Sequence, residues 1–159
     1  MTRHTYTVWD ALLASPTAPM PLAKRTHQLT RMWGGLASIE TAAAPTYDDW
    51  VVCSDAVNLM ETLIKLGHVE DTRGLLYDAV SALSNAGMRR IAGRDIRLSG
   101  TGIQAVRAIL EDYATVLETL SHRTMIHCHR LTEKRIQEVL AGDAGPNDIN
   151  ISKEQNVCT

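Results

Sequence analysis

The chain has 159 residues, enough for about one domain with a core that needs no metal ion or disulfide bond. Hydrophobic residues make up 45%, charged residues 21%, and the formal net charge is −2, which excludes a wholly disordered chain and a strongly basic protein that coats nucleic acid. Aromatic residues are scarce, with four Tyr, three Trp and no Phe. The core must therefore consist mainly of aliphatic side chains, a composition typical of helices.

The first 21 residues predict an arm that precedes the folded domain. Prolines interrupt it at three positions: Pro16, Pro19 and Pro21. Any short helix around 8–14 is therefore expected to end before an extended lead. Apolar runs stay well below the roughly 20 residues that cross a bilayer, and Asp10 interrupts a signal-peptide core. We expect a cytoplasmic protein, which also fits an odd number of cysteines kept as reduced thiols (Cys53, Cys128 and Cys158).

Two helical segments are expected over 22–67. Apolar residues line one face of the first segment, at Leu29, Met32, Leu36, Ile39 and Ala43. Pro45 ends this helix, and Thr46 followed by Asp49 resembles a capping box that opens the next one. The second helix ends at Gly67 and carries one apolar stripe: Trp50, Cys53, Val57, Met60 and Ile64, flanked by Ala56 and Leu63.

Three more helices are expected beyond Gly67. The third runs from about Glu70 to Ile91, with Leu76, Ala79, Val80, Leu83 and Ala86 facing inward, and a glycine-rich loop over 93–102 follows. The clearest pattern is an apolar seam with alternating steps of three and four residues: Ile103, Val106, Leu110, Tyr113, Leu117 and Leu120. Ser121 predicts the N-cap of a last helix that ends at Gly142.

These segments predict an all-α fold, a compact bundle of four to five helices. The bundle domain is expected over 22–142, between a flexible N-terminal arm (1–21) and a flexible tail (143–159). The seam over 103–120 has coiled-coil spacing but spans three heptads or fewer, which favours packing within one chain. We therefore expect a monomer or a weak homodimer.

No catalytic residue, cofactor or metal site is predicted. Motifs for phosphate-binding loops and for a nucleophile elbow are absent from the sequence. The cluster that best suits zinc is His122, His127, Cys128 and His129. His127 and His129, however, are about 200° apart around a helix and cannot both face one ion from a regular turn. We interpret these histidines as surface or boundary residues beside a buried Cys128.

An acidic span over 40–71 contains seven acidic residues against one lysine. Asp48 and Asp55, with Glu61 as a third candidate, fit part of one helical face. Paired carboxylates can bind Mg²⁺ or act as acid and base, but a solvated face is the simpler interpretation. The favoured functional interpretation is an acidic surface that docks a basic partner.

Four arginines lie within nine residues at a helix end and in the loop after it: Arg89, Arg90, Arg94 and Arg97. Arginine side chains suit contacts with phosphate groups, so the cluster is a candidate for binding nucleic acid. Cations at a helix C-terminus are also favoured by the helix dipole alone.

The few aromatic residues fall into two groups. Trp50, Tyr77 and Tyr113 are assigned to core faces or their edges. Trp33 lies beside an apolar seam, where a core position is favoured over an exposed interface position. Trp9, in the arm, is the better candidate for an anchor in a protein contact.

One stretch resembles a loose group of small helical accessory proteins from phages, plasmids and integrated elements of proteobacteria. The resemblance rests on Asp49-Trp50, on 55–63 and on Gly67, and it extends weakly over 113–142, about two thirds of the chain in all. It implies no catalytic residues. It implies a protein that binds and blocks or redirects a host protein, with inhibition of CRISPR or other immune complexes as one outcome.

The leading hypothesis is a non-enzymatic bundle that binds a host protein or complex stoichiometrically. The partner-binding candidates are Trp9, Trp33, Asp48, Asp55 and Glu61. The alternative hypothesis is a nucleic-acid-binding regulator that uses Arg89 to Arg97. No membrane partner is expected.

Overall fold

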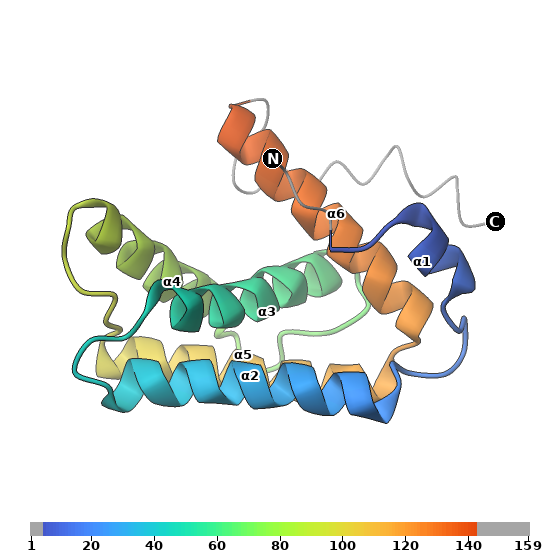
Figure 1. Cartoon of the computed structure of the whole chain (residues 1–159), viewed down its shortest axis with the longest axis horizontal. Helices are drawn as coiled ribbons and strands as arrows, with labels where there is room; N and C mark the ends of the chain where they lie inside the picture. Colours follow the sequence, from blue (N-terminus) through green and yellow to red (C-terminus); the bar gives the residue numbers. More distant parts are fainter. Residues whose placement is uncertain (1–4, 143–159) are drawn as a thin grey trace.

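The computed structural model describes residues 5–142, and every regular element in this range is an α-helix (Figure 1). The six helices are α1 (Val8–Leu13), α2 (Leu22–Thr41), α3 (Tyr47–Lys65), α4 (Leu76–Ile91), α5 (Gly100–Thr119) and α6 (His122–Ala141). The all-α prediction is confirmed: five long helices follow a short one in the arm. The expected tail, 143–159, lies outside the described residues.

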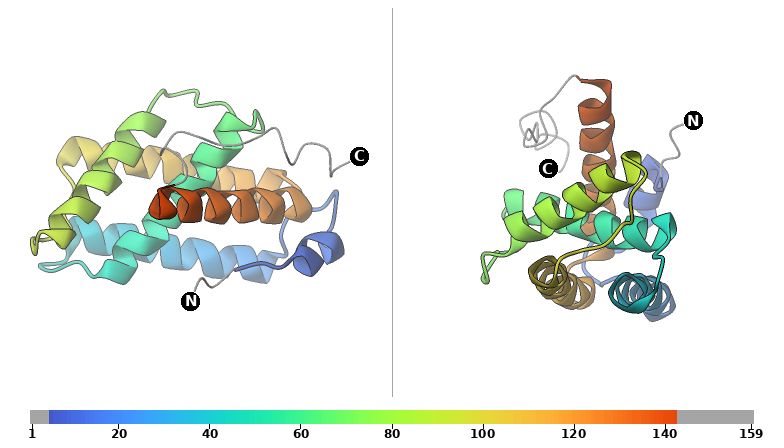
Figure 2. Two further views of the ribbon diagram at one scale, coloured as in Figure 1. Left: turned by 90° about the horizontal axis from the view of Figure 1, so that it is seen from above. Right: turned by 90° about the vertical axis from the view of Figure 1, so that its left-hand side faces the viewer.

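The helices form two crossed layers with α6 inclined to both. α2 and α5 lie side by side, and α3 and α4 cross over them (Figure 2). α6 rises steeply from the end of α5 and packs on α3, while α1 packs on α6 (Figure 1). α3 contacts α2, α4, α5 and α6, which makes it the central helix.

Burial of α3 and α5 forms most of the core. The seam predicted on α5 is buried, with Val106, Leu110 and Leu117 all 0% exposed. The middle of the stripe predicted on α3 is buried as well, while Trp50 and Ile64 at its two ends are half-buried. Ser54 and Thr62, outside the stripe, are also buried. An apolar stripe predicts burial on one side of a helix, whereas α3 is buried on nearly every side because four other helices pack against it.

The start of α4 differs from the sequence prediction. The capping box of Thr46 and Asp49 is confirmed at α3, but α4 begins at Leu76 rather than near Glu70. Two features delay it. Gly74 has a φ of +65°, which is incompatible with a continuous helix, and the Asp71 carboxylate accepts hydrogen bonds from the backbone N–H groups of Leu75 (3.2 Å) and Leu76 (3.1 Å).

α2 and α3 approach closely at Gly35. A Cβ atom there would lie 2.4 Å from Val52 Cγ2 and 2.9 Å from the Asp49 carbonyl oxygen. In sequence terms this glycine weakens its helix, but in the fold it allows the two helix backbones to pack together.

Candidate functional site

The arm contains a short helix with a complete N-terminal cap. The backbone N–H of Thr7 donates to Asp10 Oδ2 (2.6 Å), and the N–H of Asp10 donates to Thr7 Oγ1 (3.2 Å). The backbone N–H and the hydroxyl of Thr7 both donate to the Asp10 carboxylate, and these two bonds hold the pKa of the Asp10 carboxyl below its usual value. A six-residue helix is far too short to be stable alone, so α1 depends on contacts with the rest of the chain.

Polar contacts attach α1 and the chain after it to the start of α6. The Arg123 guanidinium donates from Nε to the Ala11 carbonyl (3.2 Å) and from Nη2 to the Leu12 carbonyl (2.9 Å). Two backbone N–H groups in the first turn of α6 donate to carbonyls of the arm: His122 to Ala18 (2.8 Å) and Arg123 to Ser15 (3.0 Å). The first turn of any helix has N–H groups without partners in the helix, and the arm satisfies two of them here.

The large apolar side chains of α1 face solvent. The exposed fractions are 51% for Val8, 72% for Trp9, 57% for Leu12 and 84% for Leu13, and no residue of α1 is buried. We refer to these four residues as the apolar surface of α1. Sequence reasoning singled out Trp9 alone; the missed signal was that the four residues are spaced at i, i+1, i+4 and i+5, on one side of a helix.

The other aromatic residues contact the bundle to different degrees. Trp33 is half-buried and packs against the core, whereas Tyr77 is 80% exposed, so its assignment to a core face was wrong. Tyr77 lies on the outer side of α4, whereas the neighbouring Leu76 and Ala79 face the core. The Trp50 indole donates to the Leu83 carbonyl (2.9 Å), and the ring of Tyr47 stacks on it at 5.6 Å.

Glu61 does not share a surface with the two other candidate acidic residues. Asp48 and Asp55 are both exposed on α3, seven residues apart and therefore on the same side of the helix, and Asp55 lies near α6. Glu61 is only 7% exposed and pairs with Arg135 of α6 at 2.6 Å. Six residues separate Asp55 from Glu61, which places the two side chains about 120° apart around the helix.

Three of the other acidic residues in the span have structural roles. Asp49 caps α3 and accepts a hydrogen bond from Ser38 (2.7 Å), and Glu40 pairs with Arg107. Asp71 caps the start of α4, as described above. The span therefore consists largely of caps and ion pairs.

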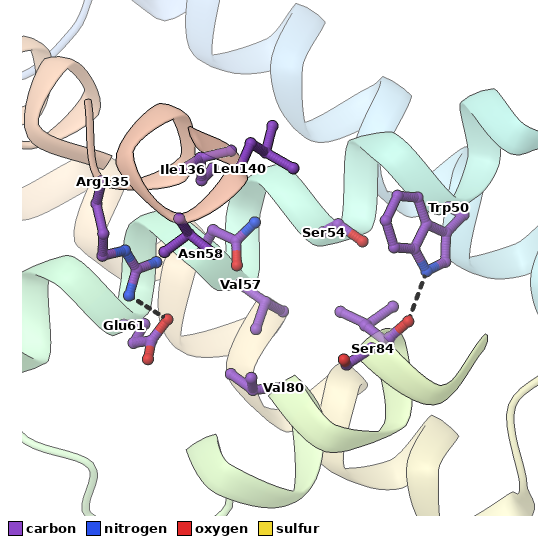
Figure 3. Close-up of a pocket in the computed structure, with 12 residues that line it drawn as sticks. Trp50, Ser54, Val57, Asn58, Glu61, Val80, Ser84, Arg135, Ile136 and Leu140 are labelled. Carbon is purple, nitrogen blue, oxygen red and sulfur yellow. Dashed lines mark hydrogen bonds and ion pairs between the residues drawn. The ribbon is translucent and has the colours of Figure 1, made fainter. Parts of the chain in front are cut away.

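An apolar cavity of about 270 Å³ lies between α3, α4 and α6 (Figure 3). Its walls are formed by Trp50, Val57, Val80, Leu83, Ile136, Val139 and Leu140, and its polar lining by Ser54, Asn58, Glu61, Ser84 and Arg135. The Glu61–Arg135 pair lies at one end and the Trp50 indole at the other (Figure 3). Such a cavity can enclose a small, mainly apolar group.

A second, polar cavity of about 240 Å³ lies between α2, α3, α5 and α6. Asp55, Gln28, Tyr113 and His129 line it, and Tyr113 donates to Gln28 Oε1 at 3.3 Å. Desolvation raises the pKa of Asp55 and lowers that of His129. His129 Nδ1 is buried without a hydrogen-bond partner, 3.6 Å from Glu133 Oε1. The surroundings thus favour the neutral forms of the carboxyl and the imidazole.

The four arginines of the basic cluster have different environments. The Arg97 guanidinium donates to the Ala43 carbonyl beyond the end of α2 and lies 3.9 Å from Asp95. Arg90 lies over the Tyr47 ring, 4.9 Å from its centroid. Arg89 is half-buried and Arg94 is exposed. Two of the four side chains therefore already contribute to contacts within the fold.

The candidate zinc ligands on α6 lie on different sides of the helix. His129 contacts the ring of Tyr6 edge-on at 5.2 Å. His127 lies near His68, whose pKa is lowered mainly by burial and further by the charge of His127. Cys128 is 0% exposed, and burial raises the pKa of its thiol to about 12. Within residues 5–142, no three His, Cys, Asp or Glu side chains are arranged to hold a metal ion.

Two further observations concern the molecule as a whole. None of the helices in the described part of the chain combines the length and the apolar character needed to cross a membrane. Searches against protein-family models, curated proteins and solved structures found no match for this chain.

Proposed function

We propose that this protein is a non-enzymatic factor that binds another protein stoichiometrically through the apolar surface of α1. The observation that supports this most directly is the way α1 is held. Arg123 and the first turn of α6 fix its backbone by hydrogen bonds, while Trp9 and Leu13 remain 72% and 84% exposed. The exposed apolar side chains of α1 therefore add little to the stability of the bundle, and they are available to contact another protein.

The energetics favour a protein partner with an apolar groove or pocket. Burying a large apolar side chain contributes about 1.5–3 kcal/mol, and tryptophan is enriched among the residues that dominate binding energy. Because α1 is already ordered, the partner does not have to fold it, and less conformational entropy is lost on binding. The resemblance to accessory proteins of mobile elements does not extend to the arm, but it makes a host immune complex the first partner to test.

The test is quantitative affinity capture from a proteobacterial lysate, followed by titration of the captured protein in purified form. The test variant is Trp9→Ala combined with Leu13→Ala. The matched control is Tyr77→Ala, which removes an aromatic side chain of similar exposure from α4. We expect one protein to bind wild type and the control in a one-to-one ratio, and to bind the double variant at least about 100-fold more weakly.

A partner that binds all three proteins equally would contradict the proposed surface. Turnover of a substrate by the pure protein would contradict the non-enzymatic role. The nucleic-acid hypothesis stays a separate prediction: a mobility-shift titration should show binding that weakens steeply with salt and on Arg94→Ala. The internal contacts of Arg90 and Arg97 give that alternative less support.

A further inference from the structure

The apolar cavity between α3, α4 and α6 is an elongated space that is lined by residues of all three helices. It follows one side of α3 from Trp50 to Glu61, and α4 and α6 form its two walls (Figure 3). Its volume of about 270 Å³ is slightly below the range of about 300–1,000 Å³ that is typical of small-molecule pockets. It therefore has room for a compact ligand and not for a protein segment.

The charges that line the cavity balance each other. Among the described residues that line the cavity, only Glu61 and Arg135 are charged, and they pair at 2.6 Å while being only 7% and 6% exposed. Lys65 also pairs with Glu61, at 2.9 Å. A cationic ligand would meet one carboxylate that already pairs with two cations, and an anionic ligand would have to compete with Glu61 for these cations. A charged ligand would therefore lose more in hydration than it gains in pairing.

One polar group in the cavity lacks a partner within the protein. Ser54 is 7% exposed, and its hydroxyl oxygen is buried without a hydrogen-bond partner. Figure 3 shows this hydroxyl pointing toward the Trp50 end, away from the Glu61–Arg135 pair. Buried hydroxyl groups are nearly always hydrogen-bonded, so the Ser54 hydroxyl retains the capacity to bond a group held in the cavity.

We propose that this cavity binds a small uncharged molecule with an apolar body and one hydroxyl or carbonyl group. The apolar body would contact Val57, Val80 and Val139, and the polar group would hydrogen-bond to the Ser54 hydroxyl. This site is separate from the apolar surface of α1, so either proposal can fail without the other.

The test is an NMR titration of the full chain with n-octanol, with octanoate as the charged control. Amide signals of residues that line the cavity should shift and saturate with n-octanol, and octanoate should bind at least about tenfold more weakly. Unsaturable shifts spread over the surface, or equal affinity for octanoate, would overturn the proposal.

Two variants test the residues involved. Ser54→Ala should weaken n-octanol binding about fivefold, as expected for one hydrogen bond, whereas the control Ser81→Ala on α4 should not. Without ligand, Ser54→Ala should not lower the thermal unfolding midpoint, because it removes an unsatisfied group. Val139→Phe should fill the cavity and abolish binding. Unchanged affinity in Ser54→Ala and in folded Val139→Phe would contradict the assigned site.

Discussion

The two ends of α6 hold their neighbouring helices in opposite ways. Near its start, Arg123 and backbone N–H groups fix α1 by hydrogen bonds, and the apolar side chains of α1 face solvent. Further along, Arg135 and Glu61 form an ion pair that is buried between α6 and α3. The contact with α3 is thus part of the core, while the contact with α1 positions a surface.

The largest effect is expected from breaking the buried ion pair. Glu61→Ala leaves the Arg135 guanidinium buried without its carboxylate and should lower the free energy of unfolding by about 3–5 kcal/mol. Chemical denaturation with urea measures this change. The double variant Glu61→Leu with Arg135→Met should recover most of the stability; a double variant as unstable as Glu61→Ala would show that the pair itself is needed.

Two leucines test the contrast between core and surface directly. Leu63→Ala, near the C-terminal end of α3, should cost about 2–5 kcal/mol, because Leu63 is 0% exposed. Leu13→Ala should change the free energy of unfolding by less than about 0.5 kcal/mol, because Leu13 is 84% exposed. Thermal and urea unfolding should agree on this difference. Similar losses for both variants would mean that α1 contributes to the core.

Removing the anchor of α1 should have a smaller, local effect. Arg123→Ala removes two hydrogen bonds to the carbonyls of Ala11 and Leu12 and should destabilise the docking of α1 by about 1–2 kcal/mol. Hydrogen exchange should then accelerate in α1 and stay slow in α3. Arg94→Ala, an exposed arginine in the loop after α4, is the control. Equal acceleration in both helices would argue against independent docking of α1.

The smallest effect concerns pH. Desolvation lowers the pKa of His129 in the folded protein, so between that value and about 6.5 the unfolded chain binds more protons. Stability should therefore fall as the pH drops below about 6.5. Asp55 contributes with the opposite sign, since its pKa is raised. Urea unfolding at about pH 7 and about pH 5 should show a smaller loss in His129→Gln than in wild type; an equal loss would assign the dependence to other groups.

The sequence predicted the helices well because their apolar residues repeat at helical spacing and their caps are local. The Thr46–Asp49 box and the seam on α5 are both confirmed. The start of α4 was misplaced because Asp71 caps it from outside the helix, which spacing alone does not reveal.

The candidate sites depended on contacts between distant parts of the chain, and these were largely missed. Glu61 and Arg135 form an ion pair although 74 positions separate them in the sequence, and no local sequence pattern around either residue predicts this pair. Likewise, Trp9 was noticed as a lone aromatic residue, while the orientation of α1 depends on Arg123, more than a hundred residues later.

The scarcity of aromatic residues gives the molecule three distinct optical reporters. Trp9 is 72% exposed on α1, Trp33 is half-buried on α2, and Trp50 is half-buried on α3, where its indole N–H bonds to the Leu83 carbonyl. Emission from Trp9 should lie at the longest wavelength and shift to the blue when a partner covers α1. With so few other fluorophores, occupation of that surface can be followed in the unlabelled protein.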